Sequence, residues 1–339
     1  MAVTIKDVAA LAGVSPSTVS RTCKNSASIS DETKERVRQA MAQLGYEPNF
    51  QASNLASQNS RTIGIVLPPS KTEVFENSIY LEMIRGISRF CNQRQYASTV
   101  ITGQDESELI QVIQTMIRSG KVDGFIILFS RQQDAVIDYL CDEGILYVLI
   151  GKVNQFINQT IYIDNDNLMA GQEATEYLIR MGHKKIAYVG SDFKKIYSLD
   201  RKNGYQLALM QHQLEILPEY CVELTGHVQD TSEPILNLLK LPEPPTAVVV
   251  SDDILAVIVQ QMCSQLGLSI PEDLSIVSFN NSLLSKINSP QLTSVDINSY
   301  QLGIEAASQM INHIENPDLL ATKSILPHYL IERQSCKKL

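Results

Sequence analysis

The sequence predicts two architectures in one chain, an all-α head followed by an α/β body of two doubly wound parallel-sheet lobes. The first sixty residues contain three short helical patterns, each with a capping residue at its start. From Thr62 onward, apolar runs of strand length alternate with helical stretches. That alternation is typical of parallel sheets with helices on both faces. At 339 residues the chain is long enough for both parts.

Charge is distributed unevenly between these two parts. The whole chain has a net charge of −9, yet residues 1–61 hold seven Lys/Arg against five Asp/Glu. The head is therefore mildly basic at +2, which leaves −11 for the rest. Because an acidic surface repels phosphate, contact with nucleic acid is expected only through the head.

The composition argues against membranes and export. No apolar run reaches the roughly eighteen residues that a membrane-spanning helix needs. Lys6 and Asp7 interrupt the N-terminal segment, which therefore does not read as a signal peptide. The six cysteines form no C-x-x-C pair and are expected to be reduced thiols. These features predict a cytoplasmic protein with no membrane contact.

The first expected helix covers residues 5–12. Thr4 can cap its N-terminus, and Gly13 can end it in a left-handed conformation. Val8 and Leu11 are expected to form its apolar stripe.

Two further helices follow, each with its own start signal. Ser15 is expected to cap a helix whose first position is Pro16, where proline costs no hydrogen bond. Ser30 is expected to cap a third helix that ends at Gly45. The buried face of the third helix is predicted to consist of Val37, Met41 and Leu44.

The first two helices are joined by A-G-V-S, which is typical of a helix-turn-helix. Val19 would be buried, while Ser17 and Thr18 are small enough to let the second helix approach a groove floor. Arg21 could then donate two hydrogen bonds to a guanine. The alternative is a surface helix of an ordinary helical subdomain, and spacing alone leaves both open.

Residues 46–61 contain little to bury and many Asn, Gln and Ser. Pro48-Asn49 can begin a short helix that includes Leu55, but so short a helix is marginal by itself. The segment is either a plain linker or a hinge that folds only when it docks on DNA.

The body restarts its strand-helix pattern after Thr160, so two similar lobes are expected, with ligand at the carboxyl ends of the strands between them. The expected division is a helix-turn-helix head at 1–46, a hinge at 47–61, a first lobe at 62–160 and 291–323, and a second lobe at 161–290 and 324–339.

A search for catalytic and metal motifs finds none. The chain lacks G-x-x-x-x-G-K-[ST], G-x-S-x-G and H-E-x-x-H, it has no G-x-G-x-x-G after the first strand, and its five histidines are scattered. The run Asp164-Asn165-Asp166-Asn167 briefly resembles a calcium loop. However, Met169 stands where that loop needs glycine, and Thr175 stands where it needs glutamate. No enzyme, cofactor or metal site is expected.

Residues 4–49, TIKDVAALAGVSPSTVSRTCKNSASISDETKERVRQAMAQLGYEPN, resemble the N-terminal signature of the lactose/galactose-repressor family. The resemblance implies a homodimer that reads a two-fold operator in double-stranded DNA. It places Pro16, Ser17 and Arg21 at base-reading positions, and Leu55 as a wedge in the minor groove. Ser53 departs from the arginine that the family commonly has there. The candidate DNA-binding residues are Thr4, Ser15, Pro16, Ser17, Thr18, Arg21, Asn25, Ser30, Asn49, Ala52 and Leu55.

The body resembles the same family through R-T-I-G-I-V-L-P, V-D-G-F-I, G-H-K-K-I-A-Y-V-G, D-R-K-N-G-Y and P-E-D-L-S-I-V-S-F. The resemblance implies lobes like those of periplasmic sugar-binding proteins, with Arg201 forking onto sugar hydroxyls. Asp252 would accept hydroxyl bonds, Asn280 would stand in for the family's usual Asp, and Tyr80 would be an aromatic wall. From the residues alone, Arg201 could instead be a surface arginine, Asp252 a helix-terminal charge and Tyr80 ordinary core.

The D-N-D-N run and S-L-D-R-K-N-G-Y most resemble the maltose-operon repressor branch of the family. That branch implies a repressor that maltose or a maltodextrin releases from its operator. No leucine heptad follows HYLIERQ, so a dimer rather than a tetramer is expected. One alternative is a catabolite-control regulator with a phosphorylated transport protein as corepressor. Another, of a different class, is a sugar-binding protein or enzyme with an incidental head.

Overall fold

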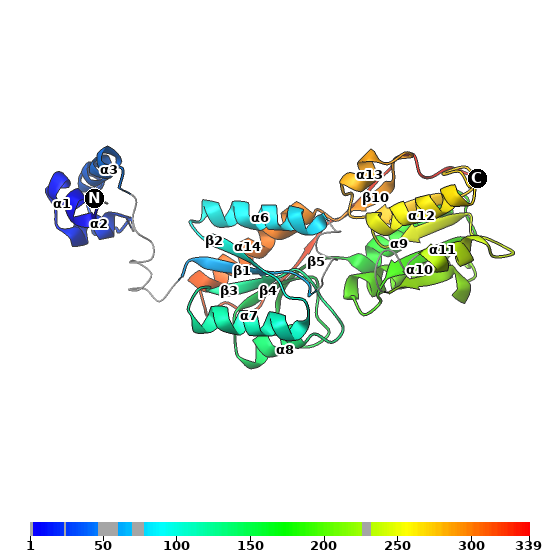
Figure 1. Ribbon diagram of the computed structural model, residues 1–339, viewed down its shortest axis with the longest axis horizontal. Coiled ribbons are helices and arrows are strands. Elements are labelled where there is room, and N and C mark those ends of the chain that lie inside the picture. The colour runs from blue at the N-terminus through cyan, green and yellow to red at the C-terminus, as the bar shows by residue number, and fades with distance from the viewer. Residues whose placement is uncertain (1–2, 24, 47–59, 70–77, 226–231) are drawn as a thin grey trace. The chain divides into compact units, whose positions relative to one another are not determined.

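The computed structural model describes residues 3–23, 25–46, 60–69, 78–225 and 232–339. The chain forms two compact units, Met1–Ser60 and Arg61–Leu339, which correspond to the predicted head and body (Figure 1).

In its described residues, the head contains the three predicted helices: α1 (Ile5–Ala12), α2 (Pro16–Cys23) and α3 (Asp31–Leu44). Gly13 ends α1 at φ +64° and Gly45 ends α3 at φ +61°. Both glycines occupy the left-handed region, which residues with a Cβ atom adopt at a cost. The capping signals in the sequence therefore located both ends of these helices.

The core of the head is small and is built on three valines. Val8, Val19 and Val37 are fully buried, and three alanines complete the cluster. Leu11, which we expected in this core, is 48% exposed, so that prediction is wrong. The buried face of α1 is centred between Val8 and Ala9, and a step of 100° per residue puts Leu11 about 110° away from it.

The first sheet of the body has strand order β11-β5-β4-β3-β1-β2, with every pair parallel. Its strands are β1 (Thr62–Val66), β2 (Ala97–Ile101), β3 (Gly124–Ile127), β4 (Tyr147–Ile150), β5 (Ile161–Asn165) and β11 (Lys323–Leu326).

The second sheet has order β12-β10-β9-β8-β6-β7 and is parallel except for its β10–β12 pair. Its strands are β6 (Ile186–Ser191), β7 (Cys221–Leu224), β8 (Ala247–Val250), β9 (Ser275–Phe279), β10 (Thr293–Asp296) and β12 (Tyr329–Ile331).

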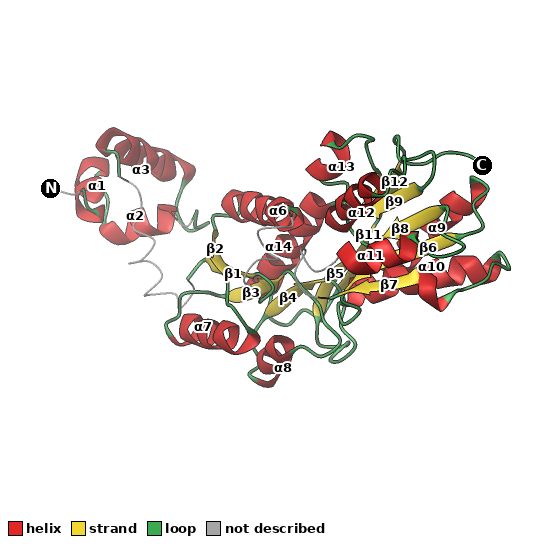
Figure 2. Cartoon of the chain, turned by 45° about the vertical axis from the view of Figure 1, so that its right-hand side comes forward, coloured by secondary structure: helices red, strands yellow, loops and turns green. Residues whose placement is uncertain are grey.

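Helices cover both faces of each sheet, which confirms the predicted doubly wound class (Figure 2). On the first sheet, α6 (Ile79–Gln93) and α14 (Ser299–Glu315) lie on the face opposite α7 (Glu106–Arg118) and α8 (Ala135–Asp142). On the second sheet, α9 (Asn167–Arg180) and α10 (Ile196–Gln211) lie opposite α11 (Ser232–Leu239) and α12 (Asp253–Gln265). The body also contains the short helices η1 (Pro218–Tyr220) and α13 (Leu283–Ile287).

Three strands lie wholly or mostly in the opposite lobe from the one we expected. We expected β5 in the second lobe, but it pairs with β4 and β11 in the first sheet. We also expected residues 324–326 of β11 in the second lobe, but β11 is the edge strand of the first sheet. We expected β10 in the first lobe, but it pairs with β9 and β12 in the second sheet. An apolar run shows that a strand exists but not which sheet it joins. The chain in fact crosses between lobes after β5, β10 and β11.

Candidate functional site

The N-terminus of α2 carries a cluster of hydroxyl groups. Ser15 Oγ lies 2.7 Å from Ser17 Oγ and 2.9 Å from Thr18 Oγ1, and it accepts the backbone N–H of Thr18 at 3.2 Å. Ser15 therefore caps α2 as predicted, and Pro16 beside it is exposed.

Arg21 is exposed in the last turn of α2. Its side chain makes no hydrogen bond or ion pair with another described residue. Ser17 lies four residues earlier and shares its face of the helix, whereas Val19 points into the core. This face therefore presents an exposed guanidinium beside small hydroxyl groups.

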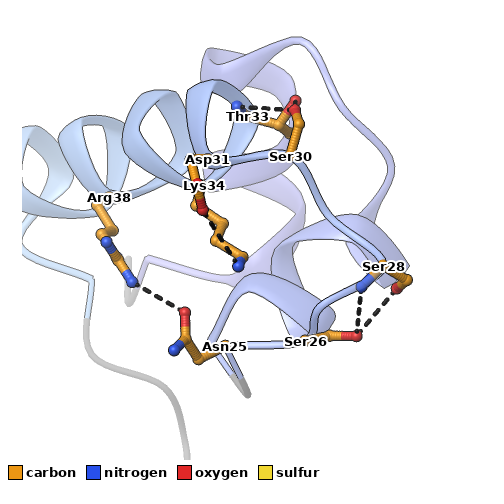
Figure 3. Close-up of polar contacts among 8 residues, drawn as sticks. All are labelled: Asn25, Ser26, Ser28, Ser30, Asp31, Thr33, Lys34 and Arg38. Atoms are coloured by element: carbon orange, nitrogen blue, oxygen red, sulfur yellow. Dashed lines mark hydrogen bonds and ion pairs between the residues drawn. The ribbon is translucent and has the colours of Figure 1, made fainter.

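Two other candidate positions cap helices. Thr4 donates to Asp7 Oδ2 from its backbone nitrogen at 2.8 Å and from Oγ1 at 2.7 Å, and these hydrogen bonds lower the pKa of Asp7. Ser30 Oγ accepts the backbone N–H of Thr33 at 3.4 Å (Figure 3). Thr4 and Ser30 thus stand at the N-termini of α1 and α3, where backbone N–H groups and the helix dipole favour phosphate.

Asn25 is held from α3 across the turn that follows α2. Its backbone has φ +49°, and its Oδ1 accepts a hydrogen bond from Arg38 Nη2 at 3.2 Å (Figure 3). Sequence reasoning did not anticipate this contact, because Arg38 lies thirteen residues away. The remaining DNA-binding candidates, Asn49, Ala52 and Leu55, lie outside the described residues, as does nearly all of the expected hinge.

The body has a cavity at the carboxyl ends of its parallel strands, with walls from both lobes. Residues after β1, β3, β4 and β5 line it from the first lobe. The start of α10 and the residue after β9 line it from the second lobe. Three of the four predicted effector residues, Tyr80, Arg201 and Asn280, contribute to the lining.

Arg201 is a buried, firmly anchored side chain of this cavity. It is only 3% exposed, so it is not the surface arginine that the sequence also allowed. Its Nε donates to Asn167 Oδ1 at 2.9 Å, and its Nη1 donates to the Ser251 carbonyl at 2.6 Å. The guanidinium carbon lies 4.3 Å from the ring centroid of Phe279 and 5.0 Å from that of Tyr197. These contacts fix the plane of the guanidinium before any ligand arrives.

The backbone around Arg201 is placed by close helix packing. A Cβ atom on Gly171 of α9 would lie 2.2 Å from the Arg201 carbonyl oxygen, and one on Gly204 of α10 would lie 2.0 Å from the Leu168 carbonyl oxygen. Only glycine at both positions lets α9 and α10 approach this closely.

Asp164, at the end of β5, is a buried acid in the cavity wall. Its Oδ1 accepts a hydrogen bond from Asn167 Nδ2 at 3.0 Å, and burial raises its pKa to about 7. Asn165 and Asn167 also line the cavity. Three residues of the D-N-D-N run thus belong to the site, which sequence reasoning missed. The available signal was its place at the carboxyl end of a strand.

The other three predicted effector residues, Tyr80, Asn280 and Asp252, differ in where they lie relative to the cavity. Tyr80 is 9% exposed and contributes both to the cavity wall and to the core beneath it. Asn280 reaches the cavity from a backbone with φ +95°. Asp252 is not among the cavity-lining residues. Its Oδ1 accepts the backbone N–H of Leu255 at 2.9 Å, so it caps α12, which is the alternative that the sequence left open.

Within the part of the chain that the structure describes, no group of three or more His, Cys, Asp or Glu side chains is placed to hold a metal ion. None of the described helices is long and apolar enough to cross a membrane.

Comparison with known proteins identifies both parts of the chain. Residues 4–49 match the bacterial regulatory proteins of the lacI family, and residues 175–336 match a periplasmic binding protein-like domain. The chain is 35% identical over 338 residues to the HTH-type transcriptional regulator MalR of Streptococcus pneumoniae (strain TIGR4), covering 98% of this chain and all of that protein. It is 35% identical over 333 residues to MalR of Staphylococcus xylosus, covering 98% of both chains.

A solved structure shows the same body. The putative transcriptional regulator LacI from Bacillus cereus subsp. cytotoxis superposes with a TM-score of 0.80 at 38% identity, covering 83% of this chain and all of that one. The relatives are transcriptional regulators rather than enzymes. Together with the helix-turn-helix head, these similarities show that the chain belongs to the LacI family and is a DNA-binding transcriptional repressor.

Proposed function

We propose that this repressor acts in the cytoplasm on a sugar-utilisation operon and that maltose or a maltodextrin, bound in the interlobe cavity, releases it from a palindromic operator. The similarity to MalR proteins supports maltose as the sugar. The observation that carries the proposal is the cavity itself, whose anchored Arg201 and polar Asp164, Asn167 and Asn280 suit hydroxyl groups. Because both lobes contribute walls, a sugar that binds one arrangement of the lobes more tightly than another shifts the balance toward that arrangement.

The proposal includes a homodimer, because a two-fold operator is read by two heads. Leu81 on α6 and Leu283 and Ile287 on α13 are 64–67% exposed. Leu81 and Leu283 line the same surface groove. Large apolar side chains gathered on one surface favour burial against a partner, here a second copy. The double variant Leu81→Glu/Leu283→Glu should sediment as a monomer and bind operator at least tenfold more weakly, whereas a dimeric variant would contradict this surface.

The effector is tested by fluorescence anisotropy of a labelled palindromic duplex from the protein's own gene neighbourhood, titrated with maltose and maltotriose at physiological salt. The wild-type protein should release the duplex. Arg201→Lys keeps the charge but cannot reach both Asn167 and Ser251, so release should need at least tenfold more sugar. Arg180→Lys, at an exposed position on α9, is the matched control and should behave as wild type.

Two results would count against this function. If Arg201→Lys releases DNA at the wild-type sugar concentration, the sugar does not use this cavity. If neither sugar releases wild-type protein from a tightly bound operator, maltose is not the inducer, and a phosphorylated transport protein as corepressor becomes the next partner to titrate.

A further inference from the structure

Two loops from different lobes pair through their backbones at the cavity. Residues 130–132 follow β3 in the first lobe, and residues 194–196 lead into α10 in the second lobe. The Gln132 N–H donates to the Lys194 carbonyl at 2.9 Å, and the Ile196 N–H donates to the Ser130 carbonyl at 3.3 Å. Arg131 and Lys195 form the antiparallel bridge between these two bonds. The lobes are thus joined by a short piece of β ladder.

An ion pair adds a second tie nearby. Lys152, which follows β4 in the first lobe, pairs with Asp200 of α10 in the second lobe. The Ser130 hydroxyl donates to the Lys152 carbonyl, so the ladder and the ion pair are connected within the first lobe.

The three chain crossings between the lobes are tied separately. Asn165 Nδ2, at the first crossing, donates to the Ile297 carbonyl at the second and to the Leu326 carbonyl at the third, both at 3.1 Å. Asn298 Nδ2 also donates to the Pro327 carbonyl at 2.8 Å. The crossings are covalently continuous and cross-bonded, so they are suited to act as a hinge. The ladder and the ion pair have no covalent link between the lobes and can separate.

The ladder places two cations directly opposite each other. A bridge flanked by hydrogen bonds in this way is a non-hydrogen-bonded pair, with Cα atoms about 4.5 Å apart, and like charges at such a pair destabilise it. Glu106 Oε1 lies 3.0 Å from Arg131 Nη1, and Asp252 attracts Lys195 electrostatically, so an acid near each cation offsets part of the repulsion. Both cations line the cavity, where a ligand meets them.

We propose that residues 130–132 and 194–196, together with Lys152 and Asp200, form an interlobe latch. The opposed cations Arg131 and Lys195 keep this latch weak. A ligand in the cavity therefore acts by shifting the balance between latched and unlatched lobes. The link from the latch to operator release rests on the proposed function. The latch itself does not, and it is tested first without sugar.

Disulfide trapping tests whether the ladder forms in solution. Arg131→Cys/Lys195→Cys is made in the full chain with Cys23→Ser, because Cys23 is exposed. The spacing of a non-hydrogen-bonded pair falls within the range that a disulfide needs. In ligand-free protein in a glutathione buffer, the effective concentration of the two thiols in Arg131→Cys/Lys195→Cys should be at least tenfold higher than in the control Lys121→Cys/Lys195→Cys. Lys121 serves as the control position because it precedes β3, whereas Arg131 follows that strand. Equal oxidation of the two pairs would overturn the latch.

Hydrogen exchange tests the role of charge. Lys195→Glu replaces the opposed cations with an opposite-charge pair, so exchange of the Gln132 and Ile196 amides should slow roughly two- to fivefold. Lys194→Glu makes the same charge change on the neighbouring residue, whose side chain points to the other side of the ladder, and it should leave those amides unchanged. Unchanged or faster exchange in Lys195→Glu, or an equal effect from Lys194→Glu, would contradict the proposal.

The trapped protein then tests the link to DNA. With the disulfide formed, operator affinity should change less than twofold on adding maltose, and reduction should restore the response. If the oxidised protein responds as fully as the reduced one, the latch is not what the ligand acts on, and the proposal fails. If wild-type protein also ignores maltose, the proposed effector is wrong, whereas the trapping and exchange results still decide the latch.

Discussion

Arg21 in the head and Arg201 in the body show how one residue type serves two kinds of recognition. Arg21 is exposed on α2, and its side chain contacts no described partner through a hydrogen bond or ion pair. Arg201 is buried, makes two hydrogen bonds and lies over two rings. The Arg21 side chain becomes ordered only when it binds DNA, and this ordering costs conformational entropy. The Arg201 side chain is already ordered in the folded protein. Changing Arg201 should therefore alter stability, whereas changing Arg21 should alter DNA binding and leave stability unchanged.

The largest expected effect is a change in the stability of the body, caused by Asp164→Asn. Because burial raises the folded-state pKa of Asp164 to about 7, the folded protein binds an extra proton between the unfolded and folded pKa values. Asp164 therefore favours folding most below pH 4, and this contribution is lost as the pH rises to 7. The neutral asparagine should make the body more stable than wild type at pH 8, by up to about 4 kcal/mol, with no gain at pH 4. Urea unfolding at both pH values measures this, and an equal difference at both would contradict the burial argument.

The next largest expected effect is a loss of body stability, caused by Arg201→Met. The change leaves Asn167 Oδ1 and the Ser251 carbonyl without the donors they now have, which should cost about 3 kcal/mol of body stability. Urea unfolding followed by tyrosine fluorescence reports this loss. Arg180→Met on the exposed surface of α9 should cost less than about 0.5 kcal/mol, and a similar cost at both positions would remove the distinction between them.

A smaller effect, confined to DNA, is expected from Arg21→Met. Losing a guanidinium that binds a guanine should weaken operator binding roughly 30-fold, or about 2 kcal/mol. Unfolding midpoints should be unchanged, because the side chain is exposed. Anisotropy with the operator and with a scrambled duplex separates base reading from phosphate contact. An equal loss on both duplexes would mean that Arg21 contacts only the backbone.

The smallest effect is expected from Ser30→Ala. Removing the N-cap of α3 should cost the head about 1 kcal/mol. Ser28→Ala, also an exposed serine in this turn but not a cap, is the control. Circular dichroism melting that shows no difference between the two variants would argue that the cap is unimportant.

Local chemistry made the head predictable from sequence. Caps at Thr4, Ser15 and Ser30 and glycines at 13 and 45 act within four residues, so the helix boundaries followed directly. The misplacement of Leu11 came from judging a buried face on an eight-residue helix, where small alanines can pack as well as a leucine. The Asn25–Arg38 bond was missed because it joins the turn after α2 to a position on α3 thirteen residues away.

Topology limited the prediction of the body. The strand pattern predicted parallel sheets, yet β5, β10 and most of β11 were given to the wrong lobes, since pairing partners lie far apart along the chain. The site showed the same limit. Arg201 was found through resemblance, whereas Lys152 and Asp164 became visible only when the strand ends converged on one cavity.

The most direct test of coupling between the cavity and the head is calorimetry of maltose binding to the full chain, with and without saturating operator. If sugar and DNA act through one equilibrium, operator should weaken sugar binding by the same factor by which sugar weakens operator binding. We expect a factor of roughly 5 to 150, equal in both directions. If sugar still releases the protein from DNA but operator leaves the sugar affinity unchanged, the coupling between cavity and head through one equilibrium is contradicted.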